Sequence, residues 1–487
     1  MKDILLVAIN AKWIHPSLAL RLLKANLGSS LENRCDIIEF ALRQPLREKT
    51  DPILTASPRI LGLSVSIWNH LAVLELLKTL RDEWDAVKRE GSSQRPVVVL
   101  GGPEVSYLPP ESEIFKFADY CIRGEGETAF RELCQTILNG QGVFVNREFY
   151  QVNTTEIKSG YRLYTDGDLS RKLIYVEASR GCPFRCEFCL SAVDVCAADA
   201  CAVVDSNRVR EFPLETFLSE MEELIQRGAK TFKFLDRTFN LNIERSKKII
   251  EFFLYNINEQ IRQNKKPFVV HFEMIPSNFP PDLIDILARF PPNTLRLEIG
   301  IQTLNPEVSA RIGRPSNPEQ ELKTLSLLVE KTNAILHVDL IAGLPGEGME
   351  SFGKGFDALW AVLNGNGAKG IEIQLGILKL LPGAPIARHI KPFGMVFNPQ
   401  PPYELIETAD IPADDMDRIK NFARFWELIV NRSLLDIGPS RVFNRFLLLS
   451  DYLFARFGRN WGIDKNELLN TISKEQATSN RQQRKEV

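Results

Sequence analysis

The sequence lacks an excess of charge of either sign. Its 487 residues include 60 Lys and Arg against 62 Asp and Glu, so the formal net charge at pH 7 is −2. A strongly basic nucleic-acid-binding surface would require many more cationic than anionic residues, and a nucleic-acid partner is therefore not expected. The charge balance points to no other partner.

Long apolar runs are also absent. No stretch of about 18 apolar residues, the length that a membrane-spanning helix needs, occurs in the sequence. The opening stretch MKDILLVAIN contains a short apolar run without a small-residue cleavage site, which favours a β-strand over a signal peptide. We therefore expect a cytoplasmic protein without a membrane span.

Cysteines are few and unevenly spread. The 8 cysteines of this long chain are better explained as reduced thiols, metal ligands or core residues than as a disulfide framework. Three of them lie in apolar strand or helix patterns typical of buried small hydrophobes, namely Cys35, Cys121 and Cys134. Another three, Cys182, Cys186 and Cys189, crowd into SRGCPFRCEFCLS, residues 179–191, which predicts a metal site.

The first 150 residues alternate strand patterns with amphipathic helix patterns. Strands are predicted at residues 3–9, 35–40, 59–67 and 95–106, with a further short strand, a turn and a helix within 118–138. Such alternation predicts a doubly wound parallel sheet, whose ligands bind beyond the carboxyl ends of the strands. Small residues follow these strand ends: Ser64 and Ser66, Gly101 and Gly102, and Gly124 and Gly126.

The clustered cysteines follow a strand pattern, KLIYVEAS at residues 172–179. Their C-x3-C-x2-C spacing supplies three thiolates on one loop, and a 4Fe-4S cluster held by three cysteines leaves one iron open to another ligand. The alternative is a structural zinc site formed by Cys186, Cys189, Cys196 and Cys201. That alternative leaves Cys182 unexplained, and its spacing is shorter than that of zinc ribbons.

Five more strand patterns follow the cysteines, each ending in polar residues, Gly or Pro. They lie at residues 229–240, 268–276, 294–305, 334–347 and 370–385, with helical stretches between them. Together with the strand before the cysteines they predict a partial barrel of β/α units, with chemistry at the carboxyl ends of the strands. The following region, residues 389–472, is predicted to be mainly helical, and residues 473–487 to be a disordered tail.

The segment GCPFRCEFC resembles the C-x3-C-x-aromatic-C signature of the radical S-adenosylmethionine (SAM) enzymes. The resemblance implies a partial (β/α)6 TIM barrel over residues 165–388. It also implies that the three cysteines hold a 4Fe-4S cluster whose open iron is chelated by SAM. An electron from the cluster, supplied by a flavodoxin or ferredoxin, would then cleave SAM to a 5'-deoxyadenosyl radical.

Other segments resemble the SAM-binding parts of the same family. The residues that this resemblance places at SAM are Phe188 (adenine), Gln302 and Thr303 (methionine group), Arg314 (carboxylate), and Gly343 and Gly346 (ribose and adenine). Asp236, in FLDRTFN, is the candidate catalytic residue near the active site. The alternative for Asp236, as for Glu298 and Glu347, is a polar residue satisfied within the fold or a helix cap.

The segments LSVSIWN, LGGPEVS and RGEGE in residues 1–150 resemble a flavodoxin-like cobalamin-binding domain, with Ser64, Gly101 and Gly102 beside the slot for the dimethylbenzimidazole tail. No Asp-x-His-x-x-Gly motif occurs in the sequence. The cobalamin is therefore expected without a histidine axial ligand, or the domain has lost it. Together with the helical tail, NAKWIHPSLALRLL resembles a cobalamin-dependent subgroup with a C-terminal domain of unassigned function.

Three functions remain open at this point. The domain pairing implies methylation of an unactivated carbon in a small-molecule, lipid or peptide substrate. The second possibility is a cobalamin-linked radical rearrangement, cyclisation or oxidation without methyl transfer. The third, a tRNA methylthiotransferase, requires three further cysteine ligands in the N-terminal domain, and the scattered Cys35, Cys121 and Cys134 fit this poorly.

Overall fold

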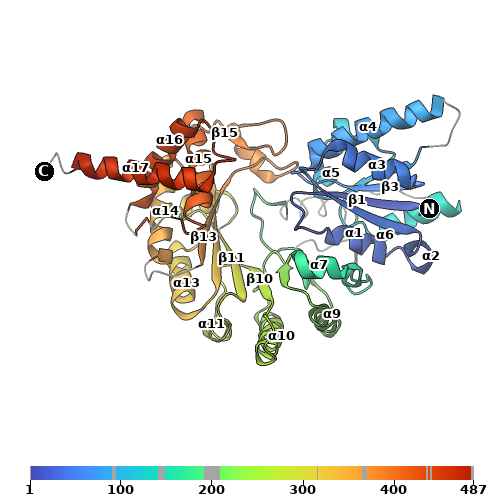
Figure 1. Ribbon diagram of the computed structural model, residues 1–487, viewed down its shortest axis with the longest axis horizontal. Coiled ribbons are helices and arrows are strands. Elements are labelled where there is room, and N and C mark those ends of the chain that lie inside the picture. The colour runs from blue at the N-terminus through green and yellow to red at the C-terminus, as the bar shows by residue number, and fades with distance from the viewer. Residues whose placement is uncertain are drawn as a thin grey trace.

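The computed structural model contains two parallel sheets and a helical C-terminal region (Figure 1). The residues that it describes are 2–89, 95–140, 149–190, 209–314, 316–364, 370–434, 437–438 and 441–483. The loop with Cys196 and Cys201 lies outside these ranges. No helix within them is both long enough and apolar enough to cross a membrane.

The N-terminal sheet has the strand order β2-β1-β3-β4-β5, and all of its neighbouring strands are parallel. Its strands are β1 (Ile4–Asn10), β2 (Cys35–Ala41), β3 (Ile60–Ser64), β4 (Val97–Gly101) and β5 (Tyr120–Ile122). This order is the flavodoxin-like form of a doubly wound sheet, in which ligands bind where the strand order reverses. The predicted fold of this domain is confirmed.

Helices cover both faces of the N-terminal sheet, because its central strands are apolar on both sides. One apolar cluster lies between the sheet and α3 (Leu46–Ala56), α4 (His70–Arg89) and α5 (Pro103–Tyr107). The second cluster lies between the opposite face and α1 (Leu18–Ala25), α2 (Ser29–Glu32) and α6 (Glu127–Asn139). The carboxyl edge of the sheet is therefore the part left for a ligand.

The second sheet is a half-barrel with the strand order β13-β12-β11-β10-β9-β6, again parallel throughout. Its strands are β6 (Ile174–Val176), β9 (Thr231–Phe234), β10 (Val269–Met274), β11 (Leu295–Gln302), β12 (Ile335–Ala342) and β13 (Ile371–Ile377). The helices along its outer face in Figure 1 are α9 (Leu214–Gln226), α10 (Ile243–Arg262), α11 (Pro281–Leu287), α13 (Pro318–Lys331) and α14 (Met349–Asn364). Each strand predicted for the barrel is present.

Both edges of the half-barrel are covered by other parts of the chain. Beside β6, the backbone N–H of Leu173 donates to the carbonyl of Ile14 at 3.0 Å. Beside β13, the Asn431 side chain accepts a hydrogen bond from Ile373 N at 3.2 Å and donates one to Ile373 O at 3.0 Å. Edge strands left open would invite pairing with another chain, so these contacts protect the sheet.

The C-terminal region contains the 3₁₀ helix η3 (Pro385–His389), the short strands β14 (Val396–Phe397) and β15 (Leu405–Glu407), and the helices α15 (Ala413–Ile429), α16 (Val442–Phe457) and α17 (Lys465–Gln483). Several of its aromatic residues, including Phe422 and Trp426, are buried in one continuous core with the outer helices of the half-barrel. Helix α17 continues to Gln483, past residue 473, where the sequence predicted the start of a disordered tail. Buried Leu468 and Ile472 attach its first turns to this core.

Candidate functional site: a cavity between the two sheets

A cavity of about 720 Å³ lies between the carboxyl edge of the N-terminal sheet and the cysteine loop. Its wall from the first domain includes Ser64, Gly101 and Gly102, the three residues predicted to flank cobalamin. Its opposite wall includes Cys182, the first predicted cluster ligand. The volume lies in the upper half of the range of roughly 300–1,000 Å³ for small-molecule pockets, which suits a bulky cofactor.

The turn after β4 requires glycine at one of its two glycine positions. Gly102 has a φ of 108°, and a Cβ there would lie 2.5 Å from the carbonyl oxygen of Val65. Gly101, next to it, has ordinary backbone geometry, and a Cβ there would meet only the Ile122 carbonyl at 3.6 Å. The bare backbone at Gly102 therefore keeps the turn tight against the end of β3 and leaves the cavity open.

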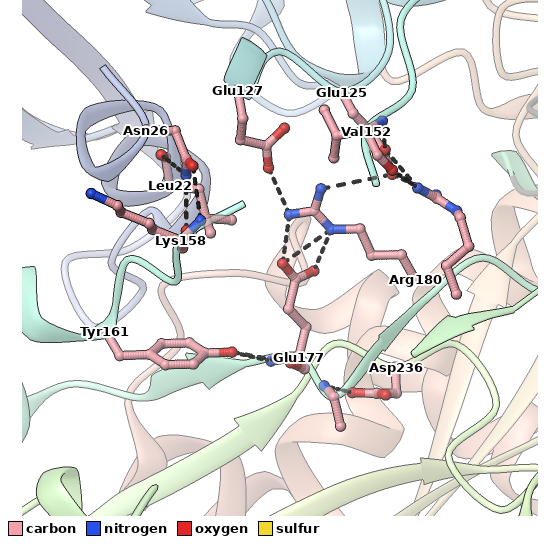
Figure 2. A network of polar contacts seen from close by, with 12 residues as sticks. Leu22, Asn26, Glu125, Glu127, Val152, Lys158, Tyr161, Glu177, Arg180 and Asp236 are labelled. Atoms are coloured by element: carbon pink, nitrogen blue, oxygen red, sulfur yellow. Dashed lines mark hydrogen bonds and ion pairs between the residues drawn. The ribbon is translucent and has the colours of Figure 1, made fainter. Parts of the chain in front are cut away.

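A buried charge network joins the two domains beside this cavity (Figure 2). Arg180, in the short strand β7 (Ser179–Arg180), donates from Nη2 to Glu127 Oε1 at 2.7 Å and to Glu177 Oε1 at 2.6 Å. Arg210, in β8 (Arg210–Glu211), donates from Nη2 to Glu125 Oε1 at 2.7 Å. Glu125 and Glu127 belong to the first domain, so the network fixes the cysteine loop to the cobalamin side of the cavity.

The pKa shifts of Arg180 and Glu177 show that each charge depends on the other. Burial alone would lower the pKa of Arg180, but the carboxylates of Glu177 and Glu127 outweigh it and hold that pKa well above the usual range. Burial raises the pKa of Glu177, which relies on Arg180 for its charge. Removing one partner would leave an uncompensated charge in a site of low polarity.

The cysteine loop is also clamped from the barrel side through Glu187. This buried carboxylate is bonded by Arg388, and its Oε2 lies 3.0 Å from Nε2 of His389 in η3. The backbone N–H of Glu187 donates to the Ile312 carbonyl at 3.0 Å, and its own carbonyl accepts from Ile386 N at 3.1 Å. Sequence reasoning missed this clamp, although a Glu inside the cysteine motif was a visible signal that a cation had to lie nearby.

The three clustered thiols fit a cluster better than a single ion. Burial raises the pKa of Cys182 and of Cys186, and the neighbouring thiols contribute to this, so the three groups lie within one another's electrostatic reach. In the described ranges, no three His, Cys, Asp or Glu side chains converge on one metal ion. A 4Fe-4S cluster instead distributes its thiolates over different irons, so three thiols spread around one loop suit it.

Arg314 lies directly beside this loop, and Gln302 lies next to Arg314. Arg314 donates from Nη1 to Cys186 Sγ at 3.7 Å and from Nη2 to the Gly300 carbonyl at 2.5 Å. Gln302, at a bulge that ends β11, has a left-handed φ of 69° and folds its amide over Gly300 toward Arg314. A cation and an amide next to the open side of a cluster could bind a carboxylate.

The other residues predicted to contact SAM have partners within the protein. The hydroxyl of Thr303 donates to Glu347 Oε1 at 2.7 Å. Gly343 has no room for a side chain against Leu405 and Met416, and Gly346 has none beneath Arg311. Phe188 is partly buried against the main core. The structure thus gives each of these four residues a packing or hydrogen-bonding role.

Asp236 supports the start of the cysteine loop. Its carboxylate accepts hydrogen bonds from Ala178 N at 2.9 Å and from Ser179 Oγ at 2.5 Å. The side chain is only 2% exposed, and burial raises the pKa of this carboxyl to about 7. This geometry describes a positioning residue, since both oxygens are occupied by the strand that carries the thiols.

A flavodoxin-like domain whose glycine-bearing edge faces a three-cysteine loop on a half-barrel defines the class of cobalamin-binding radical enzymes. The Radical SAM superfamily model matches residues 176–359, and the B12 binding domain model matches residues 4–134. The chain thus carries a B12-binding domain ahead of a radical SAM domain. These domains imply a 4Fe-4S cluster, SAM and cobalamin as cofactors.

Relatives share this pairing of domains. The chain is 25% identical over 402 residues to the cobalamin-dependent radical SAM methyltransferase TokK of Streptomyces tokunonensis, covering 77% of this chain and 54% of TokK. The chain thus spans about half the length of this curated relative.

Two solved structures share the fold. The methyltransferase TsrM from Kitasatospora setae has a TM-score of 0.57 at 19% identity, covering 79% of this chain and 74% of TsrM. The cobalamin-dependent radical enzyme OxsB has a TM-score of 0.64 at 14% identity, covering 99% of this chain and 80% of OxsB.

Proposed function

We propose that this protein is a cobalamin-dependent radical SAM methyltransferase that methylates an unactivated carbon. The cavity carries this proposal, because one wall holds Ser64, Gly101 and Gly102 and the facing wall holds Cys182. When bound, the cluster and SAM would supply a radical that removes a hydrogen atom, and methylcobalamin would supply the methyl group. Cofactors that share one cavity can act on the same substrate carbon.

Several residues of the chain fix the cysteine loop in place between the first domain and the half-barrel. Arg180 connects the cysteine loop to Glu127 at the start of α6, so the two walls of the cavity keep a constant separation. Asp236 holds the start of the loop, and Glu187 holds it between Cys186 and Cys189. Arg314 places a positive charge next to Cys186, where it stabilises the negative charge of the thiolate.

Cobalamin is proposed to bind without a protein histidine ligand. Among the described residues that line the cavity, none is histidine. His15, His70 and His389 instead contact Tyr175, Glu104 and Glu187, respectively. The remaining two histidines lie on strands of the half-barrel.

The N-terminal cysteines support methyl transfer over methylthiolation. Cys35 and Cys134 are fully buried in the first domain's core, and burial raises the pKa of Cys35 to about 12. Ligands to a second cluster need accessible thiolates, and a thiol with so high a pKa is a poor source of one.

The test is anaerobic purification from cells supplied with cobalamin, followed by iron, sulfide and cobalt analysis. The loaded protein is then incubated with three additions: SAM labelled with deuterium in its methyl group, a flavodoxin or ferredoxin reductant, and a metabolite extract of the organism from which the protein comes. We expect about four irons per chain, stoichiometric cobalt and a product that has gained the labelled methyl group. Formation of 5'-deoxyadenosine with a product that lacks the label would favour the rearrangement or oxidation alternative. Zinc without iron would exclude radical chemistry.

A further inference from the structure

The inner face of the half-barrel is polar, whereas its outer face is apolar. Side chains alternate along each strand, so Leu297, Ile299 and Val338 point outward and are fully buried under the helices. The alternate positions carry ionisable or polar groups: Tyr175, Lys233, His271, Glu273, Arg296, Glu298, His337, Asp339, Glu372 and Gln374. The signal in the sequence is a period of two within HFEM, LRLEIGIQ and LHVDLIA.

This inner face is not a packed core. The side chains of Lys233 and Glu298 remain 21% and 22% exposed, and Gln374 is exposed. Nearer the carboxyl ends of the strands, Gly300 and Gly376 contribute no side chains. The layer is therefore partly open to solvent, whereas a complete barrel of this type fills its interior with side chains.

Most polar groups of this layer have partners. Lys233 Nζ donates to Glu298 Oε2 at 2.8 Å, and the same oxygen lies 3.2 Å from His271 Nε2. His337 Nδ1 lies 3.2 Å from Glu372 Oε2 and 3.2 Å from the amide of Gln374. The His271 and His337 rings face each other with centroids 5.3 Å apart.

Three groups of the layer have at least one polar atom without a hydrogen-bond or ion-pair partner among the described residues. Within the described part of the chain, the carboxyl groups of Glu273 and Asp339 have no hydrogen bond or ion pair, and burial raises their pKa values to about 7 and about 8. His337, only 7% exposed, has no hydrogen-bond partner for Nε2 among the same residues. Asp339 lies beside Gly300 in the strand register, and the Gly300 carbonyl accepts a hydrogen bond from Arg314, which also donates to Cys186.

We propose that Glu273 and Asp339 bind a positively charged amine of the substrate. This inference rests on the proposed function and names the chemical class of its substrate. An ammonium group has several donors and no acceptor, so it can donate to carboxylates that have no partner within the protein. Asp339 pairs in register with Gly300, whose carbonyl accepts from the same Arg314 that contacts Cys186, so a carbon near that amine would lie on the side of the layer toward the cysteine loop.

The charges of the layer favour this class over an anionic substrate. Its four carboxyl groups, Glu273, Glu298, Asp339 and Glu372, face two permanent cations, Lys233 and Arg296. Lys233 is already bonded to Glu298. Burial lowers the pKa of His271, and it lowers that of His337 to about 4, so both rings are neutral near pH 7. Once Glu273 and Asp339 have lost their protons, a carboxylate or phosphate placed here would meet a surplus of like charge.

The test is calorimetric titration of the cluster- and cobalamin-loaded protein at pH 8 with three probes of equal length: hexylamine, hexanol and hexanoate. We expect hexylamine to bind roughly tenfold or more tightly than hexanol, and hexanoate to bind more weakly than either. In Asp339→Asn and in Glu273→Gln, this preference for the amine should fall to about threefold or less. Equal binding of amine and alcohol, or an amine preference unchanged in both variants, would overturn the proposal.

Two controls keep this test separate from folding and from the proposed reaction. Glu350→Gln, on α14 with a side chain 84% exposed, removes a carboxylate far from the layer and should leave all three affinities unchanged. Each variant must retain the iron content of the unaltered protein, and if one fails to do so, the other decides. Because probe binding needs no methyl transfer, absence of a labelled product would contradict the proposed function and leave the binding result standing.

Discussion

The two sheets of this protein are built from the same parallel β/α units, yet they create space for ligands in different ways. Helices cover both faces of the N-terminal sheet, so only its carboxyl edge is free, and small residues such as Gly102 keep that edge open. The half-barrel has its helices on one face, and its other face offers polar side chains such as Asp339. An edge made of backbone suits a large, flat cofactor, whereas a polar face can distinguish small substrates by charge.

The cysteine loop lies where these two spaces meet, and its removal should have the largest effect. Cys182→Ala, Cys186→Ala or Cys189→Ala should each abolish both cluster loading and SAM cleavage, since a cluster held by two thiolates is not retained. Iron analysis and detection of 5'-deoxyadenosine measure this. The matched controls Cys196→Ala and Cys201→Ala should retain both, and intact cleavage in any of the first three variants would refute the assignment.

Breaking the ion pairs between the two domains should have the next largest effect on stability. Arg180→Met leaves Glu177 and Glu127 as buried, unpaired carboxylates, and we expect it to destabilise the protein by about 3–5 kcal/mol. It should also lower cobalt retention. Chemical denaturation and cobalt analysis test this, with Arg34→Met as the control, because its more exposed pair with Asp3 should contribute far less to stability. Equal losses in the two variants would show that the network does not hold the domains together.

The backbone edge itself can be tested at adjacent positions. Gly102→Ala should cost about 1–3 kcal/mol and reduce cobalt loading, because its φ of 108° and the Val65 carbonyl both exclude a side chain. Gly101→Ala should change stability far less, since the added methyl group meets only one atom at van der Waals distance. Thermal denaturation with cobalt analysis separates the two variants, and a reversed ranking would contradict the backbone argument.

The polar face should respond to pH in a way that the backbone edge does not. The groups with raised pKa values, Glu273 and Asp339, must lose their protons to attract an ammonium, so hexylamine affinity should rise roughly tenfold between about pH 6 and about pH 9. The charged groups facing them are Glu298, Lys233, Arg237 and Asp236. Hexylamine keeps its charge over most of this range. Titrations at several pH values measure the effect; hexanol affinity should stay flat, and a flat curve for both probes would contradict it.

The parts of the fold that could be predicted from sequence are those with local signals. Buried strands such as ILLVAIN, the small residues after them and the spacing of Cys182, Cys186 and Cys189 are all visible within a few neighbouring positions. The contacts that hold the site were not visible. Glu187 and His389, like Arg180 and Glu127, are brought together by the packing of separate elements.

The polar layer of the half-barrel could be predicted from the sequence only in part. Its charged residues alternate with buried apolar residues within single strands, so Glu298 and Asp339 carried a readable pattern. Within its own strand, Glu298 is only a single polar residue, and its partners lie on other strands. Which of these groups remain without a partner depends on strand register, and register became known only with the structure.

The contacts at the two edges of the half-barrel have a consequence for how this protein can be divided. Ile14 of the first domain covers one edge strand, and Asn431 after α15 covers the other. A fragment limited to the radical SAM region would expose both edges at once, and exposed edges promote self-association. Truncation that removes Ile14 or Asn431 would uncover an edge strand, so a fragment meant for purification or for grafting into other proteins should keep both contacts.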